Sequence, residues 1–421
     1  MDNRTLLHIK RYVHSKLFQL VSIISLVILA SCSSTDDPVY TPPRALTAGE
    51  QQIVSSDNTF GLKIFKDVSS EEGDKNVVIS PLSISMALGM TVNGAAGATR
   101  DSMLRTLELQ GIPMDDINQS YKTLIDYLAN LDPNVKFDLA NSIWYRNTYH
   151  FEQSFFDVCK EHFNAEIAGL NFGDPAGSKA TINNWVNEKT NGKIKEIIED
   201  IDDASMMFLI NAIYFKGAWH KPFDAKKTID GTFYKINGER ETCKMMNQTE
   251  FLSHGANEYF KIVDLPYSNG NYSMTIFLPQ EDKTLNECIN AFTQENYNEW
   301  IGRLSHDTLE LSMPKFTVEY KIKLNDALKR LGMGLAFDRD YADFTNMDKL
   351  GGHNLSIDEV MHKTFLLVDE EGAEAAAATS VEMINTSMPH RIIMNIDHPF
   401  LFVIRDTQAG TIIFIGKILE I

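Results

Sequence analysis

The 421-residue sequence is poor in cysteine and in the short motifs that mark catalytic or cofactor sites. Its four cysteines are widely spaced, which argues against a disulfide framework and against a metal cluster. Glycine-rich phosphate loops, the two-histidine zinc helix and the strained serine elbow are all missing. We therefore predict no catalytic residue, no metal and no cofactor. Cys159, Cys243 and Cys288 are interpreted as core or surface thiols.

Positive charge is also scarce. The sequence has 39 Lys and Arg residues against 57 Asp and Glu residues, which gives a formal net charge of −18 at pH 7. Without residues 1–31, which hold four basic residues and one acidic residue, the net charge is −21. An acidic chain is repelled by phosphate backbones, so we predict that nucleic acid is not a partner.

The amino terminus has the order of an export signal. Lys10, Arg11 and Lys16 precede an apolar run over residues 17–30, which is short of the about 20 residues that a spanning helix needs. The run ends in Leu29-Ala30-Ser31-Cys32, which resembles the lipobox of bacterial lipoproteins. We predict a signal peptide over residues 1–31 and a lipid on Cys32. The alternative is an ordinary signal with an incidental cysteine.

This prediction fixes an expected location and a domain layout. The protein is expected to be exported and anchored to the bacterial cell envelope, with the outer membrane favoured and with surface exposure and the leaflet left open. Residues 32–45 contain Asp36, Asp37 and three prolines, which is typical of an extended tether. From residue 46 to residue 421 no second linker or repeat interrupts the chain, so one domain is predicted there.

Apolar periodicity indicates an α+β domain with mainly antiparallel sheets. Helical spacing is found around residues 51–68, 81–93, 153–163 and 178–189, and residues 94–97 are interpreted as the end of a helix. Strand-like runs cover residues 137–144, 208–215, 272–278, 308–320, 401–405 and 411–419, with a turn signal at Asn269-Gly270.

The most informative segment is residues 370–389, which combines many alanines with strand-like alternation. One face of a strand here would carry Ala373, Ala375, Ala377, Thr379, Val381 and Met383, and the other face Glu374, Ala376, Ala378, Ser380 and Glu382. No proline lies between Gly372 and Met388, so every amide can join a sheet. An exposed alanine-rich helix is the simpler alternative. The alternation favours a half-buried strand, with Gly372 as a backbone hinge.

Together with three other motifs, this segment resembles the reactive loop of serpins. The other motifs are NVVISPLS at residues 76–83, NAIYFKGAW at residues 211–219 and NIDHPFLF at residues 395–402. They occur in the order typical of the family and extend over essentially all of residues 46–421. The resemblance implies a serpin fold with three β-sheets, about nine helices and an exposed, metastable reactive loop over about residues 370–390.

The resemblance also implies a mechanism and a set of residues for it. A peptidase would cleave the loop, form an acyl-enzyme and be trapped when the loop inserts into the main sheet. The loop hinge would comprise Glu371, Gly372, Ala373, Glu374, Ala375, Ala376, Ala377 and Ala378. Ser80, Ser83, Asn211 and His362 would form a polar shutter where the strands part, and Trp219 would mark the point of first insertion. Satisfied core polarity is the alternative interpretation of these five residues.

The family's usual spacing from Gly372 places the scissile bond between Thr386 and Ser387, with Met383-Ile384 and Asn385-Thr386 as alternatives. A small β-branched residue before the bond favours elastase-like or subtilisin-like serine peptidases, and papain-like cysteine peptidases also form acyl-enzymes. No Lys or Arg lies between Lys363 and Arg391, so trypsin-like enzymes are not expected targets. We predict a monomeric inhibitor. A non-inhibitory serpin that serves as a surface binding module, and more remotely a surface hydrolase, are the alternatives.

Overall fold

A computed structural model describes residues 43–202, 205–348, 355–373 and 392–421 of the chain. A break after Arg44 leaves Ala45–Ile421 as a single unit, and the fold is that of this unit. The predicted signal peptide, Cys32 and residues 374–391, which include Glu374, Ala375, Ala376, Ala377, Ala378, Thr386 and Ser387, lie outside the described residues.

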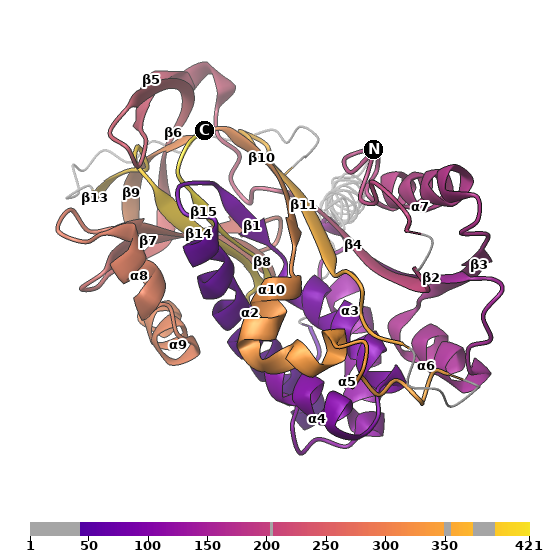
Figure 1. Ribbon diagram of the computed structural model, residues 1–421. Coiled ribbons are helices and arrows are strands. Elements are labelled where there is room, and N and C mark those ends of the chain that lie inside the picture. The colour runs from indigo at the N-terminus through magenta and orange to yellow at the C-terminus, as the bar shows by residue number, and fades with distance from the viewer. Residues whose placement is uncertain (1–42, 203–204, 349–354, 374–391) are drawn as a thin grey trace, which may run out of the picture. The chain divides into compact units, whose positions relative to one another are not determined.

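Nine α-helices and three short helical turns lie in the described ranges (Figure 1). The α-helices are α2 (Ala48–Glu71), α3 (Pro81–Gly94), α4 (Gly97–Thr106), α5 (Met114–Ala129), α6 (Gln153–Phe163), α7 (Pro175–Lys189), α8 (Leu285–Ala291), α9 (Gln294–Gly302) and α10 (Asn325–Leu328). The short turns are η1 (Ala225–Lys227), η2 (Lys329–Met333) and η3 (Gly334–Phe337). None of these helices is both long enough and apolar enough to span a membrane.

The strands form three hydrogen-bonded sheets. The largest has the order β1 (Val77–Ile79), β15 (Ile412–Ile418), β14 (Phe400–Asp406), β8 (Tyr272–Pro279), β7 (Phe260–Tyr267), β6 (Arg240–Ala256), β9 (Ser305–Pro314) and β13 (Ile392–Asn395), and β5 (Ile229–Tyr234) also pairs with β6. The second has the order β12 (Gly372–Ala373), β4 (Met207–Ala218), β2 (Lys136–Arg146) and β3 (Glu166–Leu170). The third pairs β10 (Phe316–Lys323) with β11 (Met361–Val368).

This architecture confirms the predicted α+β class and the three sheets. Among the strands of the described residues most pairs are antiparallel, and only β2 with β3 and β9 with β13 are parallel. One predicted run differs: residues 308–320 form two strands, because β9 ends at Pro314 and the chain from Phe316 turns to pair with β11. The three cysteines of the domain, Cys159, Cys243 and Cys288, are free and buried, so of the two interpretations left open they are core thiols rather than surface thiols.

Local signals explain where several elements begin. Thr47 and Glu50 form a reciprocal capping box at the start of α2. Ser80 caps α3 through the backbone N–H of Ser83, and Pro81 occupies the first helical turn, where no N–H is needed. The Asn269-Gly270 turn joins β7 to β8, with Gly270 at a φ of +89°.

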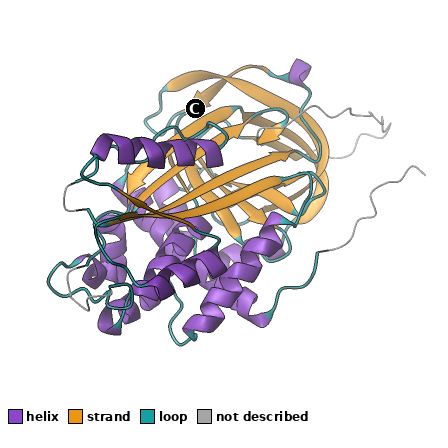
Figure 2. Ribbon diagram, turned by 90° about the vertical axis from the view of Figure 1, so that its right-hand side faces the viewer, coloured by secondary structure: helices purple, strands orange, loops and turns teal. Residues whose placement is uncertain are grey.

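Two apolar clusters pack on opposite faces of β4. Ile213 and Phe215 belong to the main core, which also holds the helices α2, α3 and α5. The alternate residues of the strand, Phe208, Ile210 and Ala212, join a smaller cluster with Ile182, Trp185 and Val186 of α7 and with Ile194, Ile197, Ile198 and Ile201. Figure 2 shows most helices gathered on one side of the strands. The even and odd residues of β4 therefore face two different environments.

Candidate functional site

The predicted hinge begins as a short strand, β12, that is already paired with β4 in the second sheet. Gly372 and Ala373 form β12, which pairs antiparallel with β4 so that Gly372 lies opposite Ala218 and Ala373 opposite Gly217. Both residues are buried. The described start of the hinge is therefore a paired strand, in which Gly372 and Ala373 run along β4.

Gly372 occupies a position that no other residue fits. Its φ is +137°, which is strained for residues with a side chain, and a Cβ there would lie 2.2 Å from the carbonyl oxygen of Gly217. It would also lie 2.8 Å from the backbone nitrogen of Trp219. The sequence interpretation of Gly372 as a backbone hinge agrees with this geometry.

A tight turn fixes the chain just before the hinge. Asp369 and Gly372 exchange backbone hydrogen bonds of 3.1 and 3.3 Å, and the Asp369 carboxylate accepts from the N–H groups of Glu371 and Gly372. The turn reverses the chain from β11 into β12. Strand β12 therefore runs antiparallel to β11 as well as to β4.

Glu370 anchors this turn to the rest of the molecule. Its carboxylate accepts a 2.8 Å hydrogen bond from the Thr228 hydroxyl and lies 2.5 Å from Lys315 Nζ. Burial acts to raise the pKa of Glu370, but the hydrogen bonds from Lys315, the backbone and Thr228, with the charge of Lys315, outweigh burial and lower that pKa. Glu370 is therefore ionised and paired at neutral pH.

Trp219, which the family resemblance assigns to the point of first insertion, lies against the turn. Its indole Nε1 donates to the carbonyl of Asp369 at 2.9 Å, and its backbone N–H donates to the carbonyl of Glu371 at 2.8 Å. The indole stacks on Tyr267, with ring centroids 4.4 Å apart and an interplanar angle of 11°. The turn thus rests on a buried aromatic pair.

Beyond the hinge, the facing edges of β4 and β11 lack a common partner in the described residues. Strand β4 pairs with β2 on one edge and with β12 on the other, where the pairing covers Gly217 and Ala218 alone. Strand β11 pairs with β10. Residues 207–216 of β4 therefore present backbone N–H and C=O groups toward β11 without a strand between them in the part of the chain that the structure describes.

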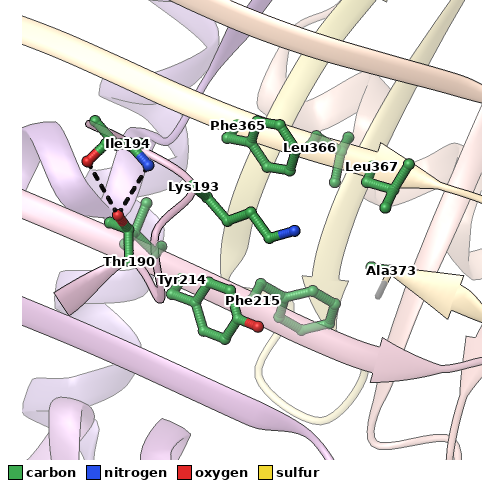
Figure 3. Close-up of a pocket in the computed structure, with 10 residues that line it drawn as sticks. Thr190, Lys193, Ile194, Tyr214, Phe215, Phe365, Leu366, Leu367 and Ala373 are labelled. Atoms are coloured by element: carbon green, nitrogen blue, oxygen red, sulfur yellow. Dashed lines mark hydrogen bonds between the residues drawn. The ribbon is translucent and has the colours of Figure 1, made fainter. Parts of the chain in front are cut away.

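Side chains fill the space between these two edges (Figure 3). A cavity of about 10 Å³ lies there, lined from β4 by Ile213, Tyr214 and Phe215, from β11 by Phe365, Leu366 and Leu367, and by Ala373, Thr190, Lys193 and Ile194. Figure 3 shows Lys193 reaching between Phe365 and Tyr214, and its Nζ lies 5.3 Å from the centre of the Phe365 ring. The cavity holds about one water molecule, so β4 and β11 must part before another strand can enter.

The predicted shutter residues meet beneath these strands. The Ser80 N–H donates to Nε2 of His362 at 3.0 Å, and the Ser83 hydroxyl donates to Oδ1 of Asn211. Burial lowers the pKa of His362 from 6.5 to about 3, so the imidazole is neutral and Nε2 can accept. The four residues of the shutter are thus brought together in two hydrogen-bonded pairs, which link α3 to β11 and to β4.

Sequence reasoning missed Asn141, which extends the shutter. Asn141 of β2 lies directly opposite Asn211 of β4 and accepts a 2.6 Å hydrogen bond from its amide, and its own amide donates to the carbonyl of Phe163 at 2.7 Å. A lone asparagine within the apolar run 137–144 was the available signal. Asp369, Glu370, Thr228 and Lys315 were also missed, because their contacts join segments that are distant in sequence.

Comparisons with known proteins identify the family. The family model described as "Serpin (serine protease inhibitor)" matches residues 55–421. The chain is 34% identical to human Serpin B8 over 372 residues, covering 87% of this chain and 98% of that protein, and 33% identical to leukocyte elastase inhibitor from Xenopus laevis over 377 residues, covering 87% and 99%.

A solved structure agrees with the sequence matches. The native state of the thermophilic serpin tengpin superposes with a TM-score of 0.81 at 33% identity, covering 91% of this chain and 98% of that one. The chain therefore belongs to the serpin family and has the serpin fold. The family is described as one of serine protease inhibitors, and one of these relatives is named leukocyte elastase inhibitor.

Proposed function

We propose that this chain inhibits serine peptidases as a suicide substrate, by inserting its cleaved reactive loop between β4 and β11. The observation that carries the proposal is the pairing of β12 with β4 at the mouth of the space between two unbridged strand edges. Once the loop is cut, β12 can lengthen along both edges by adding residues in register.

The register on the β4 side supports such an insertion. Continued residue by residue from Ala373 opposite Gly217, it would bring Glu374 opposite Lys216, Thr379 opposite Asn211 and Met383 opposite Met207. The odd-numbered loop residues would then share the face of Ile213 and Phe215, toward the main core. These are the small and apolar residues of the alternating pattern, so they suit burial there.

The register on the β11 side would also bring Thr379 to the shutter. Counting outward from the turn in which Asp369 pairs with Gly372, Thr379 would lie beside His362. Thr379 would thus enter between the two halves of the shutter, with Asn211 on one side and His362 on the other. A hydroxyl can donate and accept at once, so it can replace contacts that parting the strands removes.

Insertion would inactivate a bound enzyme by moving it. Residues 374–386 at about 3.3 Å each carry the acyl-enzyme by ~40 Å. Each new ladder hydrogen bond contributes about 1 kcal/mol, and this gain can be used to distort the peptidase. Displacing its catalytic serine from the neighbouring base and oxyanion donors prevents deacylation. Inhibition is then a race between insertion and hydrolysis.

We propose Thr386-Ser387 as the scissile bond. We propose an elastase-like or subtilisin-like serine peptidase as the target. The absence of Lys and Arg between Lys363 and Arg391 supports this choice, as does the similarity to a protein named leukocyte elastase inhibitor. Papain-like enzymes can also be trapped, because they form an acyl-enzyme. Metallopeptidases use activated water and would cut the loop without being trapped.

We also propose that the inhibitor is exported, with residues 1–31 removed, a lipid on Cys32, a tether to residue 45 and a monomeric domain from residue 46. The basic residues, apolar run and Leu29-Ala30-Ser31-Cys32 sequence support this proposal. Metabolic labelling with a palmitate analogue tests it. Label that persists in Cys32→Ala, or no label in the mature protein, rejects the anchor.

The proposed inhibition is tested with a panel of elastase, subtilisin, papain, trypsin and thermolysin. We expect SDS-resistant complexes with elastase or subtilisin, and a released peptide that begins at Ser387. A second measurement separates inhibition from the binding-module alternative. Nicking the loop with thermolysin should raise the melting temperature by about 10–20 °C if about ten new ladder bonds form, whereas a binding module that does not insert its loop should melt as before.

A further inference from the structure

The space between β4 and β11 is nearly closed at one end and wide at the other. Near Ala373 the cavity between the strands measures about 10 Å³. A second cavity, of about 350 Å³, lies where β4 begins and the chain leads into β11. We call it the strand-end pocket, and its walls are Met206, Met207 and Leu209 on the β4 side and Leu355, Ser356 and Ile357 on the β11 side. A volume above about 300 Å³ is typical of small-molecule sites.

Each wall of the pocket is anchored to a different element. The carbonyl of Met206 accepts a 2.9 Å hydrogen bond from the backbone N–H of Arg146 in β2, and the N–H of Ile357 donates to the carbonyl of Ala336 in η3, also at 2.9 Å. Among the described residues no backbone hydrogen bond joins one wall to the other. The pocket therefore does not depend on a ligand to stay open.

The lining is mainly apolar and rich in methionine. Phe344 and Met347, both buried, line the pocket together with the two walls. Methionine side chains are flexible and polarisable, so they can adapt to the shape of a ligand. Four of the wall residues are half-buried and pack against the edge of the main core: Met206, Met207, Leu209 and Ile357. This lining predicts a ligand whose surface is mainly apolar.

The charged residues that line the pocket already have partners. Arg339 Nη2 lies 3.6 Å from Oδ1 of Asp358, and Glu359 pairs with Lys323. A charged ligand would have to displace one of these partners or bury its own charge without one, which costs free energy. The Ser356 hydroxyl, by contrast, can donate to or accept from one polar atom of a ligand. The pocket therefore favours an uncharged molecule.

We propose that the strand-end pocket binds a small, uncharged, mainly apolar molecule with a single hydrogen-bonding group. Its volume corresponds to a compound of two or three rings, with on the order of 12–18 non-hydrogen atoms. The site lies at the end of β4 away from β12, and it belongs to the intact protein. Binding there does not depend on the proposed inhibition.

The test uses a matched pair of fluorescent probes on the full chain. N-phenyl-1-naphthylamine is uncharged, has about 17 non-hydrogen atoms and one N–H, and becomes bright in apolar surroundings. Fluorescence titration should show one saturable site with a Kd of about 10 μM. Its analogue 8-anilinonaphthalene-1-sulfonate has the same rings with a negative charge, so it should bind at least about ten-fold more weakly.

Two variants fill the pocket from opposite walls. Ser356→Trp and Leu209→Trp should each raise the Kd of the uncharged probe at least about ten-fold, because the indole occupies the space that the probe needs. The matched control is Ser70→Trp, the same substitution in another cavity, which measures about 680 Å³ and is lined by Leu62 and Phe292 among others. It should change Kd less than about two-fold, since the two cavities are separate.

Thermal melts by circular dichroism identify the variants that fold, and the use of both walls keeps the test valid if one variant does not. No saturable binding to the wild type, or an unchanged Kd in a folded filling variant, overturns the proposal. Equal binding of the sulfonate overturns the assignment to uncharged ligands. A loss of binding in Ser70→Trp alone overturns the proposal in favour of the other cavity. No peptidase takes part in the titration, so its result stands apart from the proposed inhibition.

Discussion

At the centre of the largest sheet the strands are hydrogen-bonded on both edges, whereas the edges of β4 and β11 that face each other are largely unpaired in the described residues. Strands β8, β14 and β15 each have a hydrogen-bonded neighbour on both edges, and every residue in them is buried. Strands β4 and β11 each leave most of one edge unbridged in the described residues. The comparison teaches that unpaired strand edges can be confined to one seam, the space between β4 and β11, while the backbone ladders at the centre of the largest sheet are complete.

The largest effect is expected from blocking the seam. Ala377→Arg would bring a charged side chain to the core-facing side of the inserted strand, and Ala375→Pro would remove a ladder donor. Either variant should convert the inhibitor into a substrate, with at least about 100-fold less trapped complex per loop cleaved, since insertion would no longer outrun hydrolysis. Densitometry of SDS gels measures the ratio of complex to cleaved inhibitor.

Ala377→Ser is the matched control for these variants, because it changes the same position by one small atom. We expect it to trap nearly as well as the wild type. Trapping by Ala377→Arg at the wild-type ratio would mean that the seam is not where the loop goes.

The second prediction concerns the centre of the largest sheet, where the strands are hydrogen-bonded on both edges. Phe402 of β14 is fully buried and packs over Gly416, whose position has no room for a side chain. Phe402→Ala should cost about 3–5 kcal/mol. The loss should be the same in the intact and the nicked protein, because β14 has both neighbours in either form.

Urea unfolding of intact and nicked Phe402→Ala measures this loss, with Phe402→Leu as a milder control below about 1.5 kcal/mol. A loss that differs between the two forms by more than about 1 kcal/mol would show that β14 takes part in the movement, and the contrast between the two regions would no longer hold.

A third prediction uses a buried carboxyl away from the seam. Asp57 of α2 accepts a 2.8 Å hydrogen bond from the Tyr121 hydroxyl, and burial raises its pKa from 3.8 to about 7. The folded state therefore holds a proton that the unfolded state has lost. Stability from this group is complete below about pH 4 and falls as the pH rises to about 7, by about 4 kcal/mol in all.

Asp57→Asn should remove that dependence and stabilise the protein at pH 8 by about 2–4 kcal/mol relative to the wild type, with little difference at pH 4. The buried His362 acts in the opposite direction, because its lowered pKa costs stability as the pH falls from 6.5 toward 3. Unfolding curves of both proteins between pH 4 and 8 isolate the Asp57 contribution, and parallel curves would contradict it.

The smallest effect is expected at the edge of the seam. Glu370→Gln keeps the shape of the side chain but removes its charge beside Lys315. Because the pair is partly exposed, we expect a loss of about 1 kcal/mol or less and a somewhat faster insertion from a looser turn. Stopped-flow fluorescence of a labelled loop compares the insertion rates, and Glu371→Gln serves as a neighbouring control. A slower insertion in Glu370→Gln would show that the anchor assists the movement.

The difference between patterns within one segment and contacts between distant segments explains which features the sequence could predict. The strands at residues 272–278, 401–405 and 411–419 were found because continuous apolar runs encode burial directly. The alternation over residues 373–383 predicts a strand with one buried face, and of these residues the structure describes Ala373 alone. Apolar runs and alternation both depend on residues that are close together in the chain, so they can be recognised from the sequence alone.

Contacts between distant segments could not be found in this way. The roles of Ser80, Ser83, Asn211 and His362 rested on family resemblance, because nothing local in a serine or an asparagine tells which distant strand it will meet. The pairing of Glu370 with Thr228 and Lys315 depends on the break between β9 and β10, which the single run 308–320 concealed. The early pairing of Gly372 and Ala373 depends on the position of Ala218 relative to the Asp369 turn.

The parallel pairing of β13 with β9 has a consequence for what remains after cleavage. If the loop is cut at the proposed Thr386-Ser387 bond, the piece that begins at Ser387 contains β13, β14 and β15, and the last two lie in the interior of the largest sheet. This fragment could not diffuse away without unfolding the domain. Under the proposed mechanism a spent inhibitor would therefore be a two-chain protein held together without a covalent bond, and because insertion would carry its severed ends apart, it could not be religated and used again.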